Sequence, residues 1–186
     1  MQDYVAQLGQ DRFVALALDG KRNGTFLDIG AGEPRDISNT WWLETELGWA
    51  GVLCDLETCD RLTRERKSPV LRDAFRQDWR HIATSLADED GFIDFLSMDL
   101  EPPDLTMALV QSFPWDAVRF RVLTVEHDAY RAGGDSRRER MAEILEAHGY
   151  LRVGTASLNG AEIDDWWVDP SQVDEKALAR VREVFA

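Results

Sequence analysis

Short apolar runs alternate with amphipathic stretches along the chain. The runs are rich in β-branched and aromatic residues, and many end at a glycine or an acid, which is typical of buried strands. We expect strands at 24–30, 51–56, 69–73, 92–98, 119–126, 151–157 and 163–168. Apolar positions at helical spacing, with capping residues at several ends, predict helices between them. These helices are expected at 3–18, 38–48, 59–67, 104–113, 137–148 and 170–185.

Strands that alternate with helices predict an α/β fold with a mainly parallel sheet covered on both faces. The last two strands have only a loop between them, so we expect an antiparallel edge. No linker rich in glycine, serine or proline divides the sequence, which predicts a single domain over 1–186. Within it we expect an N-terminal helix in 1–20, a cofactor-binding core in 21–157 and a closing strand and helix in 158–186.

The first strand runs into a glycine turn, Asp28-Ile-Gly-Ala-Gly32. In sheets of this kind ligands bind beyond the carboxyl ends of the strands. Gly30 and Gly32, on either side of Ala31, let the backbone come close to such a ligand and permit a positive φ. Arg35 stands where the dinucleotide fingerprint needs a third glycine, which counts against a nicotinamide cofactor.

The other strand ends are acidic. Asp55 ends the second strand, where an acid can accept both ribose hydroxyls of an adenosine group. Acids also follow the third, fourth and fifth strands, namely Asp73, Asp99, Glu101, Glu126 and Asp128. A ligand at these ends would meet many carboxylates and no arginine cluster. This arrangement favours a cationic, phosphate-free cofactor, and S-adenosylmethionine, with its sulfonium and amino groups, is such a molecule.

The charge balance narrows the range of partners. The 186 residues carry 21 basic and 35 acidic side chains, a formal charge of −14. Such a chain repels phosphate backbones and anionic membrane surfaces, so we expect neither nucleic acid nor membrane as a partner. No apolar run approaches the length of a membrane span and the first residues lack the order of a signal peptide, which predicts a cytoplasmic protein. Cys54 and Cys59 lack the spacing of a redox or zinc pair and are expected to be free thiols.

Several segments, taken in order, resemble the FkbM family of S-adenosylmethionine-dependent methyltransferases. They are Gly24-Thr-Phe-Leu-Asp-Ile-Gly-Ala-Gly32, Ser38-Asn-Thr40, Leu43-Glu44, Leu47-Gly-Trp-Ala-Gly51, Phe95-Leu-Ser-Met-Asp-Leu-Glu101 and Val125-Glu-His127. The resemblance covers about residues 20 to 155. It implies a class I methyltransferase fold, a Rossmann-like three-layer sandwich, and methylation of a hydroxyl, often on a sugar or a polyketide-type natural product. Family members usually follow the acidic pair with glycine and then glutamate, whereas this chain has Pro102-Pro-Asp104.

The resemblance also implies which residues contact the cofactor. These are Asp28, Gly30, Ala31, Gly32, Asn39, Asp55, Asp73 and Asp99. The glycine turn would bind the methionine part, Asp55 would hold the ribose and Asp73 would lie near the adenine. Asp99 and Glu101 would face the methyl donor or the acceptor.

Methylation of a hydroxyl needs a base, and His127 is the first candidate because the usual pKa of histidine, about 6.5, suits neutral pH. A flanking carboxylate, Glu126 or Asp128, would orient the ring. Alternation along a strand puts Glu126 and His127 on opposite faces, so both reach one site only if the strand has ended. The alternative is that His127 is a hydrogen-bonded polar residue at a strand end.

Asp99 and Glu101 form a second candidate catalytic pair. On an extended segment residues two apart point the same way, so these carboxylates could share a proton, act as one base or hold a metal ion. A divalent ion bound by these two acids and His127 is conceivable, but the sequence does not favour a metal.

Two further expectations concern side-chain exposure. Trp166 and Trp167 are adjacent on an expected strand, so one is expected to be buried and the other to face outward. The basic run Arg137-Arg-Glu-Arg140 is expected to be a solvated helix start.

The leading hypothesis is an S-adenosylmethionine-dependent O-methyltransferase that acts on a small hydroxylated acceptor. One alternative is a non-catalytic module that binds adenosine or a partner through the same fold, suggested by the altered Pro102-Pro103 loop. A further alternative is an NAD(P)-dependent reductase. The sequence leaves open the acceptor, the methylated position and the oligomeric state, a homodimer included.

Overall fold

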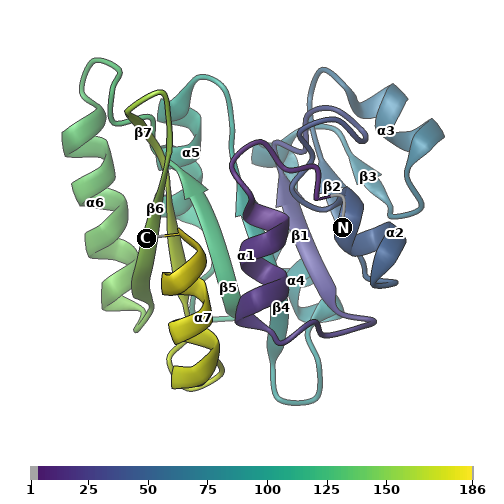
Figure 1. Ribbon diagram of the computed structural model, residues 1–186. Coiled ribbons are helices and arrows are strands. Elements are labelled where there is room, and N and C mark those ends of the chain that lie inside the picture. Colours follow the sequence, from purple (N-terminus) through teal and green to yellow (C-terminus); the bar gives the residue numbers. More distant parts are fainter. Residues whose placement is uncertain (1–3, 186) are drawn as a thin grey trace.

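The computed structural model describes residues 4–185, which form one sheet with helices on both faces (Figure 1). The strand order is β3-β2-β1-β4-β5-β7-β6. Its strands are β1 (Thr25–Ile29), β2 (Ala50–Cys54), β3 (Val70–Leu71), β4 (Phe92–Met98), β5 (Arg119–Glu126), β6 (Leu151–Leu158) and β7 (Ala161–Val168). The strands from β3 to β5 run parallel, and β7 lies antiparallel between β5 and β6. The predicted α/β fold, a mainly parallel sheet with an antiparallel edge, is confirmed.

Helices cover the two faces of this sheet. They are α1 (Gln10–Ala17), α2 (Trp41–Glu46), α3 (Cys59–Glu65), α4 (Trp79–Leu86), α5 (Pro103–Ser112), α6 (Gly134–Ala147) and α7 (Glu175–Phe185), with a short 3-10 helix η1 (Ala74–Arg76). Apolar side chains of α1, α2 and α7 pack on one face, and those of α4, α5 and α6 pack on the other. In Figure 1, α1 and α7 lie side by side in front of the sheet. None of the helices in residues 4–185 is both long and apolar enough to cross a bilayer.

Each face of the sheet has its own apolar core because strand residues alternate in direction. Trp166 is 2% exposed and stacks on Phe13 of α1 with ring centroids 4.7 Å apart. Trp167 is 1% exposed and lies in the core under α4, α5 and α6. The expectation that one of these tryptophans faces outward is therefore wrong, because helices cover both faces. Cys54 and Cys59 are both buried free thiols, as predicted.

Some element boundaries differ from the prediction. The first helix begins at Gln10, and residue 3, where it was expected to begin, lies outside the described residues. Helix α4 was not among the predicted elements, and α6 begins at Gly134, before the predicted start. Arg137 is 8% exposed, so the expectation of a solvated basic run at this helix start is wrong for that residue.

Candidate functional site

The glycine turn after β1 lies between the ends of β2 and β4. Gly30 and Ala31 donate their N–H groups to Cys54 O at 2.8 and 3.1 Å, and Asp99 N donates to Ile29 O at 2.8 Å. Gly30 has a φ of 86°, and a Cβ atom placed on it would lie 1.6 Å from Asp99 O. Only glycine fits this position, because the close neighbour is backbone that has no room to move away.

Asp55 connects this turn to the loop after β2. Its Oδ2 accepts a hydrogen bond from Gly32 N at 3.0 Å, and its Oδ1 accepts from Glu57 N at 2.9 Å and Thr58 N at 2.7 Å. Thr58 Oγ1 donates back to Gly32 O at 2.6 Å. A carboxylate oxygen has two acceptor lone pairs, so Oδ2 can also accept from a ligand hydroxyl. The half-buried Asp55 therefore shapes the turn and can contact a ligand there.

Asp28 lies beneath the turn. It is 1% exposed and accepts a hydrogen bond from Thr40 Oγ1 at 2.6 Å, and Thr40 Oγ1 in turn accepts one from Arg66 at 3.1 Å. Burial raises the pKa of Asp28. The structure thus gives Asp28 a positioning role: it holds the loop that contains Asn39, whose amide donates to Ser97 Oγ on β4 at 3.0 Å.

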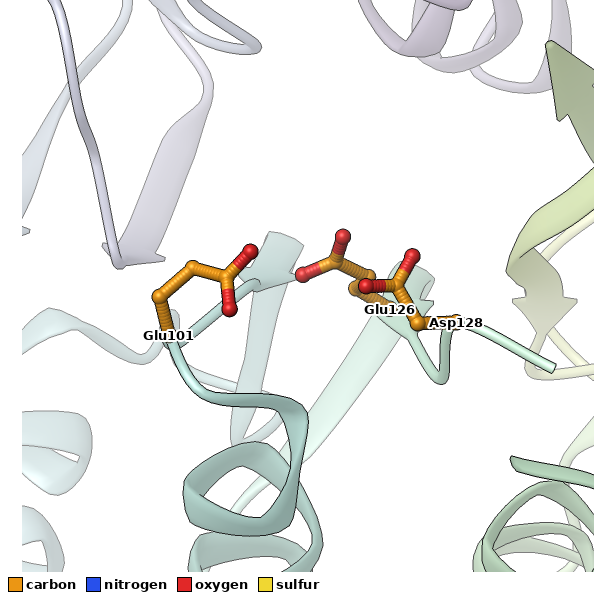
Figure 2. A group of neighbouring side chains, drawn as sticks. All are labelled: Glu101, Glu126 and Asp128. Atoms are coloured by element: carbon orange, nitrogen blue, oxygen red, sulfur yellow. The ribbon is translucent and has the colours of Figure 1, made fainter. Parts of the chain in front are cut away.

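Four acids gather at the ends of β4 and β5. One carboxylate oxygen each from Glu101, Glu126 and Asp128 lies within 4.8 Å of the other two, and Figure 2 shows the three side chains turned toward one another. Arg131 contacts this group from the outside, 2.9 Å from Glu101 Oε1 and 2.7 Å from Asp128 Oδ2. Asp99, the fourth acid, lies close enough to Glu126 for their carboxyl groups to share a hydrogen bond. The group of Asp99, Glu101, Glu126 and Asp128 is called the acidic cluster below.

The acids of the cluster affect one another's protonation. Burial, followed by the hydrogen bond and the charge of Asp99, raises the pKa of Glu126 to about 11. Burial also raises the pKa of Asp99. Glu126 therefore keeps its proton at neutral pH, and the two carboxyl groups titrate as a hydrogen-bonded pair.

His127 lies on the other side of β5 from Glu126. It is 1% exposed, its Nδ1 accepts a hydrogen bond from Ala129 N at 3.1 Å, and its Nε2 is 3.6 Å from Asp165 Oδ1. Asp165 is itself held by Arg138 of α6 at 2.8 Å, which places this pair under the α6 side of the sheet. The structure thus separates His127 from the acidic cluster. The metal trio of Asp99, Glu101 and His127, which the sequence did not favour, does not come together among the described residues.

Asp73 follows the short strand β3. Its Oδ1 accepts from Phe75 N at 3.0 Å at the start of η1, and its Oδ2 is 3.3 Å from Arg76. Its charge and that of Asp55 both raise the pKa of Cys54, after the larger effect of burial, so both carboxylates lie near this thiol at the end of β2. The expectation that Asp73 lies near an adenine stays a prediction.

The sequence patterns assigned no role to Arg131 or to Asp164. Asp164 pairs with Glu126 across β7 and β5, is 5% exposed, and accepts a hydrogen bond from Gln10 Nε2 at 2.7 Å. Burial and then the charge of Asp99 raise its pKa to about 7. An acid directly opposite Glu126 could have been found only with the strand register, which the sequence does not give.

Replacing Asp164 by asparagine should stabilise the protein at alkaline pH. Because the folded pKa is raised, the stability associated with protonated Asp164 is complete below about pH 4 and is lost as the pH rises through 7. Asparagine keeps an acceptor for Gln10 and carries no charge. Urea unfolding followed by circular dichroism should show that the advantage of Asp164→Asn grows by roughly 2–3 kcal/mol between pH 5 and pH 8. An equal advantage at both pH values would contradict this account.

Comparisons with known proteins place the fold. No family model matches the chain, and no curated protein matches it. Among solved structures, a Clostridium thermocellum protein proposed to be an rRNA methylase is 13% identical, with a TM-score of 0.56 over 89% of this chain and 98% of its own. Aeropyrum pernix fibrillarin with natively bound S-adenosyl-L-methionine is 16% identical, with a TM-score of 0.52 over 87% of this chain and 76% of its own. The METTL16 methyltransferase domain is 11% identical, with a TM-score of 0.59 over 85% of this chain and 65% of its own.

These similarities also correct one expectation. A protein proposed to be an rRNA methylase and a pre-rRNA processing fibrillarin from Methanococcus jannaschii share the fold of this chain. The exclusion of nucleic acid as a partner is therefore wrong, because a net charge affects long-range attraction and does not define what a site accepts. What the similarities do show is the architecture: the chain has the Rossmann-like fold of class I methyltransferases.

Proposed function

We propose that the protein transfers a methyl group from S-adenosylmethionine to a hydroxyl oxygen. The observation that carries this proposal is the contact between Gly30 and the backbone of Asp99. This contact brings the glycine turn after β1 next to Asp99 of the acidic cluster, which follows the adjacent strand β4. Both lie at the carboxyl edge of the sheet, where ligands of such folds bind. The resemblance to the FkbM family, based on the segments around this turn and cluster, supports a hydroxyl as acceptor.

The site suits the three parts of this cofactor. The ribose hydroxyls would donate to Asp55, whose Oδ2 has acceptor capacity left beside its bond to Gly32 N. The methionine part would lie along the backbone of Gly30 and Gly32. The sulfonium would then face the carboxylates after β4 and β5, which favour a positive charge.

In the proposed reaction Asp99 accepts the proton of the acceptor hydroxyl. The oxygen forms a bond to the methyl carbon while the carbon–sulfur bond breaks, and its electron pair leaves with sulfur to give neutral S-adenosylhomocysteine. Alignment of the reacting atoms can supply about 7–11 kcal/mol, and a placed base adds roughly 10²–10⁴-fold. Glu126 donates a hydrogen bond to Asp99 and so holds it in place.

Cofactor binding is the first test. We expect S-adenosylhomocysteine to bind the full chain with a dissociation constant in the range of about 1–100 μM, about −5.5 to −8 kcal/mol. Asp55→Ala should weaken this binding roughly 10- to 100-fold, because hydrogen bonds to a charged group are lost. Isothermal titration calorimetry checks both, with Asp60→Asn, an exposed acid paired with Arg72, as the control that should bind like the unmodified chain.

The outcomes of this test separate the competing hypotheses. An absence of binding at millimolar S-adenosylhomocysteine would refute the proposed function. Binding without methyl transfer to any member of a panel of hydroxylated small molecules and RNAs would instead support a non-catalytic adenosine-binding module. A response to NADH and none to S-adenosylhomocysteine would favour the reductase.

A further inference from the structure

Three acids of the cluster converge on one point. Glu101 lies on the loop after β4, Glu126 ends β5, and Asp128 lies two residues further on (Figure 2). One oxygen from each lies within 4.8 Å of the other two. Oxygens this close can bind one small cation together, since metal–oxygen distances are about 2.0–2.6 Å for magnesium and calcium.

Two buried oxygens in this group accept no hydrogen bond from any N–H or hydroxyl group of the described residues. Glu126 is 9% exposed and Asp128 is 1% exposed, yet no hydrogen-bond donor of the described residues reaches Glu126 Oε2 or Asp128 Oδ1. Buried carboxylate oxygens without a partner are costly, and natural proteins supply one. Both of these atoms belong to the side chains that point into the group shown in Figure 2.

Arg131 does not supply the missing partner. Its guanidinium binds both oxygens of Glu101, at 2.9 and 3.0 Å, and the other oxygen of Asp128, Oδ2, at 2.7 Å. It is 40% exposed in its side chain and lies on the solvent side of the group. Arg131 therefore leaves Asp128 Oδ1 and Glu126 Oε2 available, and it competes with an added cation only at Glu101.

We propose that Glu101, Glu126 and Asp128 form a binding site for a divalent cation such as Mg²⁺ or Mn²⁺. Carboxylate oxygens are the preferred ligands of these hard ions, and three protein ligands leave coordination positions for water or substrate. Cation binding itself does not depend on the proposed function, because all three ligands belong to this chain. In the proposed reaction the ion would bind the acceptor oxygen beside Asp99 and favour its deprotonated form. Glu126 would then hold the ion in place of its hydrogen bond to Asp99, and this second part rests on the proposed function.

The test is titration of the EDTA-treated full chain with Mn²⁺, with free Mn²⁺ followed by electron paramagnetic resonance. We expect one site with a dissociation constant at or below about 1 mM, the weak end for natural carboxylate sites. Glu126→Gln should weaken binding at least about tenfold, since a neutral amide oxygen is a poorer ligand for a hard cation than a carboxylate oxygen. Arg131→Gln should tighten binding several-fold because it frees Glu101, whereas Asp60→Asn, an exposed acid outside the cluster, should change nothing.

Two results would overturn the site. One is the absence of Mn²⁺ binding at several millimolar; the other is a Glu126→Gln variant that binds as tightly as the unmodified chain. Thermal unfolding in EDTA confirms that each variant is folded, and Asp128→Asn replaces Glu126→Gln should that variant not fold. S-adenosylhomocysteine binding measured in EDTA tests the proposed function separately, so that failure of one does not imply failure of the other.

Discussion

Replacing Gly30 by alanine is expected to abolish measurable binding of S-adenosylhomocysteine and to destabilise the protein by more than about 3 kcal/mol. A Cβ atom at this position would lie 1.6 Å from Asp99 O and 2.5 Å from Asp99 C, so β1 and β4 must move apart at their carboxyl ends. The backbone φ of 86° adds strain for any residue other than glycine. Urea unfolding and isothermal titration calorimetry measure the two effects.

Alanine variants of two other glycines with a positive φ separate the effect of backbone strain from that of the steric clash with Asp99. Gly91 has a φ of 82°, and a Cβ atom placed on it would meet nothing within 4 Å, so Gly91→Ala should cost only about 1 kcal/mol and leave ligand binding intact. Gly32 has a φ of 59°, and the nearest atom to a Cβ placed there is Gly30 O at 4.0 Å. Gly32→Ala should therefore cost little more stability than Gly91→Ala. It should still weaken ligand binding, because Gly32 lies in the turn that is proposed to contact the ligand. A Gly30→Ala variant that behaves like Gly91→Ala would show that the contact with Asp99 is unimportant.

Much of the architecture follows from local sequence patterns. Strand β5 runs from Arg119 to Glu126, with the bounds that its β-branched and apolar residues predict. Helix α4 was missed, although its signals are present: Asp78 accepts a hydrogen bond from His81 N, and Trp79, Ala83 and Leu86 recur at helical spacing. The segment around it is polar, so its apolar positions are sparse and only tertiary packing on the sheet makes them conspicuous.

The sequence was sufficient to predict that acids lie at the ends of the strands. It was not sufficient to predict the directions in which their side chains point. Because alternation separates neighbours, His127 turns away from Glu126 toward Asp165. Asp128 has a φ of 46°, a left-handed turn after the strand has ended, and its carboxylate returns to Glu126. Aspartate adopts this left-handed conformation more often than most residues, but that propensity does not tell at which aspartate the chain turns. The partners across the sheet, such as Asp164, depend on a register that forms only on folding.

Arg137 shows how tertiary contacts override a surface pattern. In sequence it begins a charged run typical of a solvated helix face. In the structure its Nε donates to His127 O at 2.8 Å, its Nη2 donates to Asp128 O at 3.3 Å, and its Nη1 is 2.8 Å from Asp104 Oδ1. The arginine thus satisfies carbonyl groups of the loop after β5, and it fixes the loop that carries Asp128.

Replacing Asp99 by asparagine is expected to lower methyl transfer by roughly 10²–10⁴-fold, the usual contribution of a placed base. Asparagine retains an oxygen that can accept a hydrogen bond from the protonated carboxyl group of Glu126, so the fold and the glycine turn should be preserved. Binding of S-adenosylhomocysteine should stay within about fivefold, because a lost charge at a partly screened distance changes affinity by no more than about 1 kcal/mol. Transfer of a radiolabelled methyl group to an accepted substrate, under single-turnover conditions, measures the rate.

Comparison of Asp99→Asn with two further variants identifies the residue that acts as the base. Asp116→Asn removes an exposed acid that pairs with Arg80, and it should transfer methyl groups at the unmodified rate. His127→Gln should also retain most of the rate, since the imidazole is 1% exposed and lies on the α6 side of the sheet. Should His127→Gln lose the rate while Asp99→Asn keeps it, the histidine predicted from the sequence is the base. In that case the acidic cluster positions the cofactor or a cation and takes no part in proton transfer.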